Sequence, residues 1–178
     1  MSLQDIESVA DHSYSTCALS LLMADLEVQS GKYVNVERVM RLALLHDLSE
    51  SLTFDISKEY LEYLGPSGEA IKAELEHAAW KHIMDGLKEP KLRRGYSHLQ
   101  EEFDAEQTLE SKIVHAADKL DILLQVIQYR RKGYSASLLA DLWDGTNKKL
   151  LSSEIPSARK IQRILIREAR RPGAGRIK

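Results

Sequence analysis

Apolar and small residues recur at intervals of three and four along nearly the whole chain, which is the spacing of one face of an α-helix. The first such stretch runs from Val9 to Leu26, and Gly31, a residue type that commonly ends helices, follows it. Asn35 and Thr108 precede two further periodic stretches and are good N-terminal caps. No stretch of useful length alternates between apolar and polar residues. The pattern therefore predicts an all-α fold, a helical bundle with short connections.

The periodic stretches also predict where the helices begin and end. Helices are expected at about residues 9–30, 36–47, 58–64, 68–86, 109–132, 135–150 and 156–171. Residues 51–57 are predicted to be a loop, and residues 88–103 a loop with one short helix. Trp80 and Trp143 on such amphipathic helices are expected to serve packing.

Length and composition indicate one globular domain over residues 1–178. The chain of 178 residues and 20.2 kDa is 43% hydrophobic and 29% charged, which is enough to bury a sizeable core. Cys17 is the only cysteine, which excludes an internal disulfide and a zinc site built from cysteines. No apolar run approaches the roughly 20 residues of a membrane-spanning helix, and no secretory leader is visible. We therefore expect a cytoplasmic protein that does not enter membranes.

The net charge of −2 is distributed unevenly along the chain. Eight of the nine charged residues from Ser157 onward are basic, and Glu168 is the one acid among them. A basic segment of this kind can bind nucleic acid, but on an amphipathic helix it is more often a solvated face. The aromatic residues that a nucleic-acid platform uses for stacking are missing here. The pattern favours a solvated helix face, followed by a basic tail at residues 172–178.

Ionisable residues occur at positions that the helical pattern places toward the core. His12 lies in the apolar stripe of the first helix, His46 and Asp47 continue the stripe of the second, and Asp118 and Asp121 share a face of the long helix from residue 109. Burying such groups without partners costs several kcal/mol, so their positions need a chemical reason. Imidazole nitrogens and carboxylate oxygens are ligands that suit Mn²⁺, Co²⁺, Fe²⁺ or Zn²⁺. Neighbouring residues on a helix diverge by about 100°, so we expect the helix to end at the His46–Asp47 pair, where both side chains can reach one cavity.

Three segments resemble, in order, those of the HD-domain superfamily of metal-dependent phosphohydrolases. The segments are "ESVADHSY", "RLALLHDLSESLTFDI" and "ESKIVHAADKLDILLQ", and they look most like the 5′-deoxynucleotidase-like branch. The resemblance covers about residues 6 to 130. It implies one bound divalent metal ion, whose identity among Mn, Co, Fe, Zn and Mg stays open, and four metal ligands: His12, His46, Asp47 and Asp118.

The same resemblance implies roles for other residues and a reaction. Glu50 matches a glutamate that handles protons beside the metal site, and Asp55 matches an acid near the substrate sugar or the attacking water. Lys119 and Lys58 are weaker matches for residues that contact the substrate phosphate. The expected reaction is hydrolysis of a phosphate monoester, a nucleoside or deoxynucleoside 5′-monophosphate. Because relatives are commonly dimers, a homodimer is also expected.

One departure from the branch concerns the segment before His12. Relatives carry an arginine for the phosphate and a tryptophan for the sugar there, whereas the eleven residues that precede His12 contain neither. Either the chain is shortened or it binds its substrate differently.

Two alternative functions stay open. A phosphodiesterase or nucleoside triphosphate hydrolase with two metals would use additional histidines between Asp47 and Asp118, where His77, His82 and His98 lie. We expect these three histidines to be surface groups instead. A regulatory module without activity would have lost its ligands or Glu50, and neither loss is seen.

Overall fold

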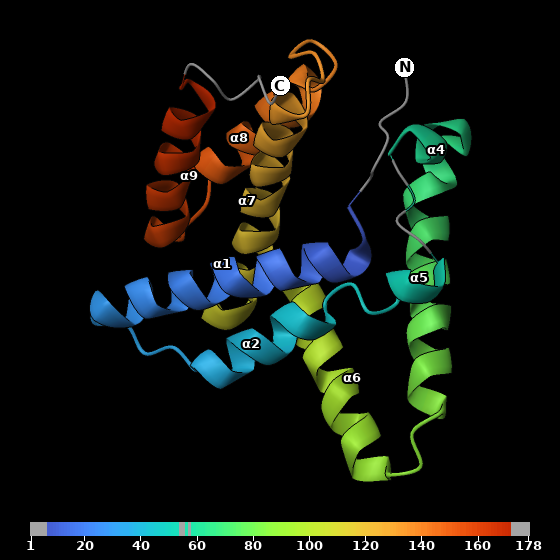
Figure 1. Ribbon diagram of the computed structural model, residues 1–178. Helices are drawn as coiled ribbons and strands as arrows, with labels where there is room; N and C mark the ends of the chain where they lie inside the picture. Colours follow the sequence, from blue (N-terminus) through green and yellow to red (C-terminus); the bar gives the residue numbers. More distant parts are fainter. Residues whose placement is uncertain (1–6, 54–55, 57, 172–178) are drawn as a thin grey trace. The chain divides into compact units, whose positions relative to one another are not determined.

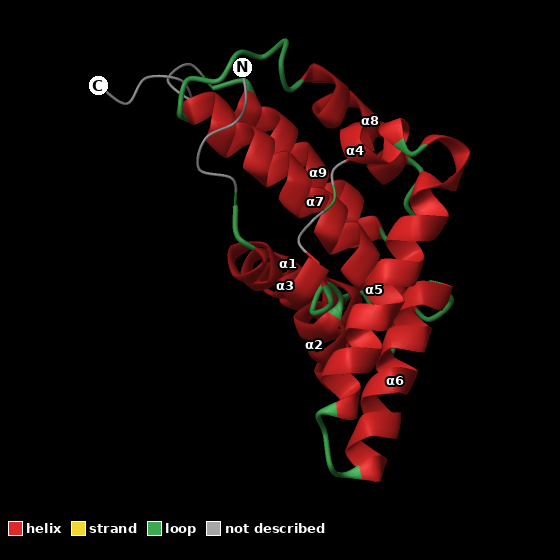
Figure 2. Ribbon diagram, turned by 90° about the vertical axis from the view of Figure 1, so that its right-hand side faces the viewer, coloured by secondary structure: helices red, strands yellow, loops and turns green. Residues whose placement is uncertain are grey.

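The computed structural model describes residues 7–53, 56 and 58–171, and these residues form helices joined by turns and short loops, without any strand (Figure 2). The prediction of an all-α fold is confirmed. In order, the helices are α1 (Val9–Gln29), α2 (Val36–Leu45), α3 (Glu50–Thr53), α4 (Lys58–Tyr63), the 3-10 helix η1 (Gly65–Ser67), α5 (Gly68–Asp85), α6 (Pro90–Ala105), α7 (Leu109–Arg131), α8 (Ala140–Leu151) and α9 (Pro156–Ala169). None of the helices in this described part of the chain has the length and apolar character that crossing a membrane requires.

The helices pack into two compact units (Figure 1). The first unit comprises Met1–Tyr14 and Leu44–Ala105, and within it α5 packs against α3, α4 and α6. The second comprises Ser15–Ala43 and Glu106–Lys178, and within it α7 packs against both α8 and α9. The single domain expected over residues 1–178 stays a prediction.

Local capping explains where several helices begin and end. The Asn35 side chain accepts a hydrogen bond from the backbone N–H of Arg38 at 3.0 Å, and the Thr108 hydroxyl accepts one from that of Ser111 at 3.1 Å. Each bond satisfies a donor at the helix start that has no partner within the helix. Gly31 and Gly133, with φ of 91° and 98°, follow α1 and α7 in the left-handed conformation that glycine adopts most easily. The sequence predictions for Asn35, Thr108 and Gly31 are confirmed.

The prediction for residues 88–103 is wrong, because α6 is a continuous helix over Pro90–Ala105. Leu92, Tyr96, Leu99 and Phe103 follow one another at steps of four, three and four, and Leu99, at the middle of this face, is buried. Packing of this apolar face against α5 outweighs the cost of the glycine at position 95 in the helix interior. Two smaller differences are that residues 50–53 form the short helix α3, and that α8 begins at Ala140 rather than near residue 135.

Gly68, the first residue of α5, allows the backbone of α4 to come close. A Cβ atom at this position would lie 3.1 Å from the carbonyl carbon of Leu61 and closer still to its oxygen. We expect Gly68→Ala to lower the free energy of unfolding by about 1–3 kcal/mol, because rigid backbone atoms must move to make room. Urea unfolding of the variant measures this effect.

The matched control for this variant is Gly95→Ala within α6, where no atom lies within 4 Å of the added Cβ. We expect that substitution to raise the free energy of unfolding by about 0.5–1 kcal/mol, since alanine restricts the unfolded chain and favours the helix. Equal and small effects at both positions would contradict the close approach inferred at Gly68.

A buried carboxylate links the end of α1 to the start of α9 within the second unit. Glu27 is 1% exposed, accepts a hydrogen bond from the backbone N–H of Ser157 at 2.8 Å, and forms an ion pair with Lys32 at 2.7 Å. Burial alone would raise the pKa of Glu27, but Lys32 and Ser157 together hold this pKa below its ordinary value. The folded state is therefore stabilised by the ionised form of Glu27.

We expect Glu27→Gln to lower the free energy of unfolding by about 1–2 kcal/mol at neutral pH. Because the pKa of Glu27 is lower in the folded than in the unfolded state, this stabilisation is fully present above the unfolded pKa and is lost as the pH falls through the folded one. The difference between parent and variant should thus shrink below about pH 4. Urea unfolding across pH measures it, and Glu154→Gln, which removes an exposed ion pair with Lys112, is the control with little effect at any pH.

Candidate metal centre

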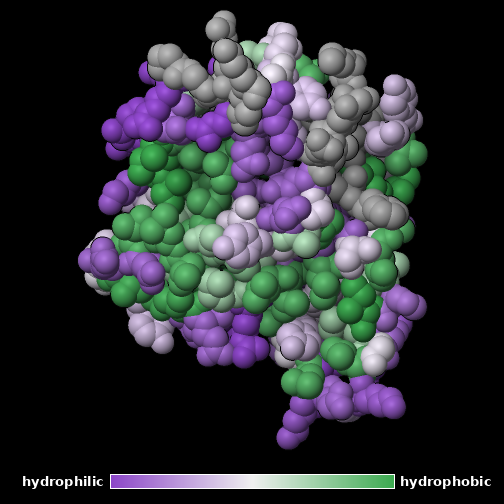
Figure 3. Space-filling model, viewed as in Figure 1, coloured by the Kyte–Doolittle hydropathy of each residue, from purple (hydrophilic) through white to green (hydrophobic). Residues whose placement is uncertain are grey.

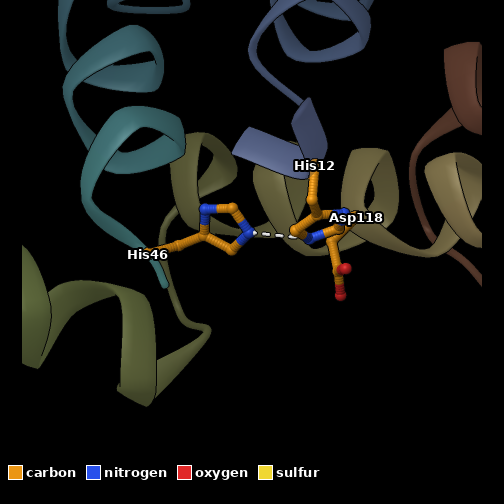
Figure 4. Close-up of side chains that lie close together, drawn as sticks. All are labelled: His12, His46 and Asp118. Atoms are coloured by element: carbon orange, nitrogen blue, oxygen red, sulfur yellow. Dashed lines mark hydrogen bonds between the residues drawn. The ribbon is translucent and has the colours of Figure 1, made fainter. Parts of the chain in front are cut away.

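Two histidines and an aspartate of the first unit direct three ligand-type atoms toward one point. The Nε2 atom of His46 lies 3.3 Å from that of His12, and Oδ2 of Asp47 lies 3.2 Å from His12 Nε2 and 3.1 Å from His46 Nε2. Figure 4 shows the two imidazole rings turned toward each other, one from the first turns of α1 and one from just beyond the end of α2. The side chains that the sequence placed in two separate motifs are therefore brought together.

The end of α2 explains how two neighbouring residues can serve one site. The helix ends at Leu45, and residues 46–49 form a turn before α3 begins at Glu50. Within a continued helix the side chains of His46 and Asp47 would diverge by about 100°. The turn removes this constraint, which is the reason the sequence suggested for placing the pair at a helix end.

The three separations fit a shared metal ion. Two ligand atoms that are each about 2.1 Å from one ion, at an angle of about 100°, lie about 3.2 Å apart. Without a cation or shared protons at the centre, the lone pairs of the two Nε2 atoms and the carboxylate oxygen would repel one another. Two imidazoles and a carboxylate are a donor set that suits Mn²⁺, Fe²⁺, Co²⁺ or Zn²⁺. The residues present thus fit a divalent cation.

Asp47 is held in its ionised form by the two histidines. Burial alone would raise the pKa of Asp47, but hydrogen bonds from His12 and His46 and their charges hold it far below the ordinary range of aspartate. The side chain of His46 is 2% exposed, whereas those of His12 and Asp47 are 17% and 23% exposed. A ligand can therefore approach the site from the side of His12 and Asp47.

Phe103 of α6 supports the His46 ring, a role that was not predicted from the sequence. Its ring meets that of His46 edge to face, with a centroid distance of 5.6 Å and an interplanar angle of 64°. Edge-to-face contact restricts the rotation of the imidazole and so helps to direct its Nε2 atom. Residues 88–103 were expected to be mostly loop, although the spacing of Leu92, Tyr96, Leu99 and Phe103 was a signal for a helix with one apolar face.

Glu50, the predicted proton-handling residue, lies beside the ligand pair. It is the first residue of α3, its backbone N–H donates to the carbonyl oxygen of Asp47 at 3.0 Å, and its side chain is 13% exposed. The ammonium group of Lys72, on α5, lies 3.6 Å from Oε1 of Glu50. Lys72 carries no recognisable signal in the sequence, because nothing in the local pattern relates it to α3.

The other predicted site residues are placed less completely. Asp118 and Lys119 lie on α7 in the second unit, both half-buried, and their roles as fourth ligand and phosphate contact stay predictions. Asp55 lies outside the described residues. Lys58 begins α4, and its side chain lies outside the described part of the chain.

Two kinds of ionisable residue remain: Asp121 on the long helix, and the histidines between Asp47 and Asp118. Asp121 is fully buried on α7, in line with its place on a core-facing side of the helix. His77, His82 and His98 are exposed on α5 and α6, as expected. They therefore lend no support to a second metal ion.

Similarity to known proteins places this chain in a family. The sequence matches the HD domain family over residues 2–158. The chain belongs to the HD-domain family. One relative is the 5′-deoxynucleotidase HDDC2 of Danio rerio, which is 32% identical over 84% of this chain and 68% of the relative. Another is the 5′-deoxynucleotidase HDDC2 of Homo sapiens, which is 30% identical over 86% of this chain and 69% of the relative.

Solved structures agree with this placement. A conserved hypothetical protein from Pyrococcus furiosus is 32% identical and superimposes with a TM-score of 0.71 over 94% of this chain and 86% of its own. An HD-domain phosphohydrolase from Listeria innocua, 22% identical, has the same fold, with a TM-score of 0.74 over 95% of this chain and 80% of its own. The predicted membership of the HD-domain family and the predicted enzyme class, a metal-dependent phosphohydrolase, are confirmed.

Proposed function

We propose that this chain hydrolyses the phosphate monoester of nucleoside or deoxynucleoside 5′-monophosphates with the help of one divalent metal ion. The observation that carries the proposal is the convergence of His12 Nε2, His46 Nε2 and Asp47 Oδ2 within 3.1–3.3 Å of one another. The relatives named 5′-deoxynucleotidase, at 30–32% identity, support the choice of substrate. Asp118 of α7 is the proposed fourth ligand.

His12, His46 and Asp47 would hold the metal ion, which, when bound, supplies Lewis acidity toward the phosphoryl oxygen and lowers the pKa of water. The ionised Asp47 contributes the negative charge that attracts a cation into the site. Phe103 and the burial of His46 keep one ligand fixed, so that little reorganisation is needed on binding.

Glu50 is the proposed general acid or base. Its backbone contact with Asp47 keeps it next to the ligands, while its carboxylate is none of the three converging groups. It can accept a proton from the attacking water or donate one to the leaving 5′-oxygen, a role worth about 10²–10⁴-fold in rate. Asp55 is proposed to contact the sugar or the attacking water, and Lys119 and Lys58 the phosphate.

A phosphate-release assay tests the proposed function. Metal-stripped protein is supplied separately with Mn²⁺, Co²⁺ or Mg²⁺ and is offered ribo- and deoxyribonucleoside 5′-monophosphates, 3′-monophosphates, triphosphates and a phosphodiester. We expect metal-dependent release of phosphate from the 5′-monophosphates and loss of activity with a chelator. Hydrolysis of the diester alone would indicate a phosphodiesterase, and hydrolysis of the triphosphates alone a nucleoside triphosphate hydrolase. If no compound is hydrolysed, a regulatory module is favoured.

We further propose that the protein is a cytoplasmic homodimer. Leu138 and Leu142 are exposed before and within α8, although Leu139 and Trp143 beside them are at least partly buried. Leu21 and Leu22 are also exposed on α1, and Figure 3 shows apolar side chains gathered over this helix. Exposed apolar surface of this kind favours association. We expect light scattering at micromolar concentration to give twice the mass of the chain, and the mass of a single chain would contradict the dimer.

A further inference from the structure

The side chain of Glu50 needs support from outside its own helix. Glu50 begins α3, which has only four residues, and an isolated helix of that length has almost no stability of its own. A residue that exchanges protons with a reacting group must nevertheless be held closely in place, because a displacement of about 1 Å can reduce the rate by about 10²-fold. Another part of the first unit must therefore fix the carboxylate of Glu50.

Lys72 is in the position to do so. It lies on α5, a helix of 18 residues that packs against α3, and its Nζ atom is 3.6 Å from Oε1 of Glu50. Glu76, one turn further along α5, lies 3.4 Å from the same Nζ atom. The lysine side chain is only 24% exposed, so its charge is less screened by water than that of a surface lysine. The ammonium group thus lies between two carboxylates, one on each helix.

We propose that Lys72 is a positioning residue, whose ammonium group holds the Glu50 carboxylate in the orientation that proton transfer requires. Glu76 anchors the lysine on the more rigid helix, and Lys72 in turn anchors Glu50. The inference rests on the proposed function, since it assigns to Lys72 a task within the same reaction. It distinguishes Lys72 from Lys119 and Lys58, which are proposed to contact the substrate phosphate.

The kinetic test compares Lys72→Met with the parent protein. We expect kcat to fall about tenfold while KM and the bound metal stay unchanged, because Lys72 acts on Glu50 and not on the substrate or the ligands. Lys72→Arg, which keeps the charge, should recover most of the lost kcat. Lys81→Met is the matched control: it removes the exposed Lys81–Asp85 pair, 2.6 Å apart on the same helix, and should leave both constants unchanged.

A double variant shows whether Lys72 acts through Glu50. Once Glu50→Gln has removed proton transfer, adding Lys72→Met should cause no further loss of kcat. A further tenfold loss in the double variant would mean that Lys72 acts independently, and a raised KM with normal kcat would mean that it binds the substrate. Either result overturns the inference.

Crystal structures of two variants, which do not depend on enzymatic activity, test this inference separately from the proposed function. In crystal structures of Lys72→Met and Lys81→Met, we expect the Glu50 carboxylate to be displaced or disordered in the first and to keep its position in the second. An unchanged Glu50 in Lys72→Met overturns the inference even if the parent is a fully active nucleotidase. Conversely, a parent protein without phosphatase activity contradicts the proposed function. In that case the crystal structures alone show whether Lys72 positions Glu50.

Discussion

Replacing His46 by alanine is expected to remove the bound metal and to lower phosphatase activity by more than about 10³-fold. The Nε2 atom of His46 lies within 3.3 Å of both other converging ligand atoms, and its side chain is fully enclosed, so no other group can take its place. Loss of the cation removes several kcal/mol of charge stabilisation from the transition state, at about 1.4 kcal/mol for each factor of ten in rate. Elemental analysis of the purified variant, together with the phosphate-release assay, measures both effects.

The control for this prediction is His82→Ala, which removes an exposed histidine of α5. That variant should keep both metal and activity. Circular dichroism should show that His46→Ala is still helical, so that loss of metal is not a consequence of unfolding. A His46→Ala protein with one metal ion per chain would refute the assignment of the centre to His12, His46 and Asp47.

Glu50→Gln is expected to separate metal binding from catalysis. Glutamine preserves the size of the side chain and the backbone contact with Asp47, but it cannot accept or donate a proton at the reacting atoms. We expect the variant to fold and to bind the parent amount of metal, while kcat falls by about 10²-fold or more. Elemental analysis and steady-state kinetics on the same preparation measure the two properties.

Glu76→Gln provides a matched comparison, because it also removes a carboxylate next to Lys72 but leaves Glu50 in place. Its kcat should fall far less than that of Glu50→Gln. If Glu50→Gln kept near-normal turnover, Asp55 would become the better candidate for proton transfer, and Asp55→Asn would be the next variant to assay. Loss of metal from Glu50→Gln would instead make Glu50 part of the ligand set.

The sequence predicted most helices because their signals are local. The caps at Asn35 and Thr108 and the glycines after α1 and α7 act within a few residues, so they can be recognised without knowledge of the fold. The helix α6 was missed because packing of its apolar face against α5, the helix that precedes it, stabilises it more than local propensity does.

The chemical identity of the candidate site was likewise determined by the sequence. The order of His12, the His46–Asp47 pair and Asp118 in a helical chain indicated both metal-ligand chemistry and the HD-domain family, since ligand types and motif spacing are properties of the chain itself.

Only the tertiary structure decided which side chains meet. The triangle of His12, His46 and Asp47 depends on the end of α2 and on the packing of the first unit, and the contacts of Phe103 with His46 and of Lys72 with Glu50 join residues of different helices. Such contacts carry no signal in local sequence, because they arise from the burial of helix faces against one another rather than from any pattern within one helix.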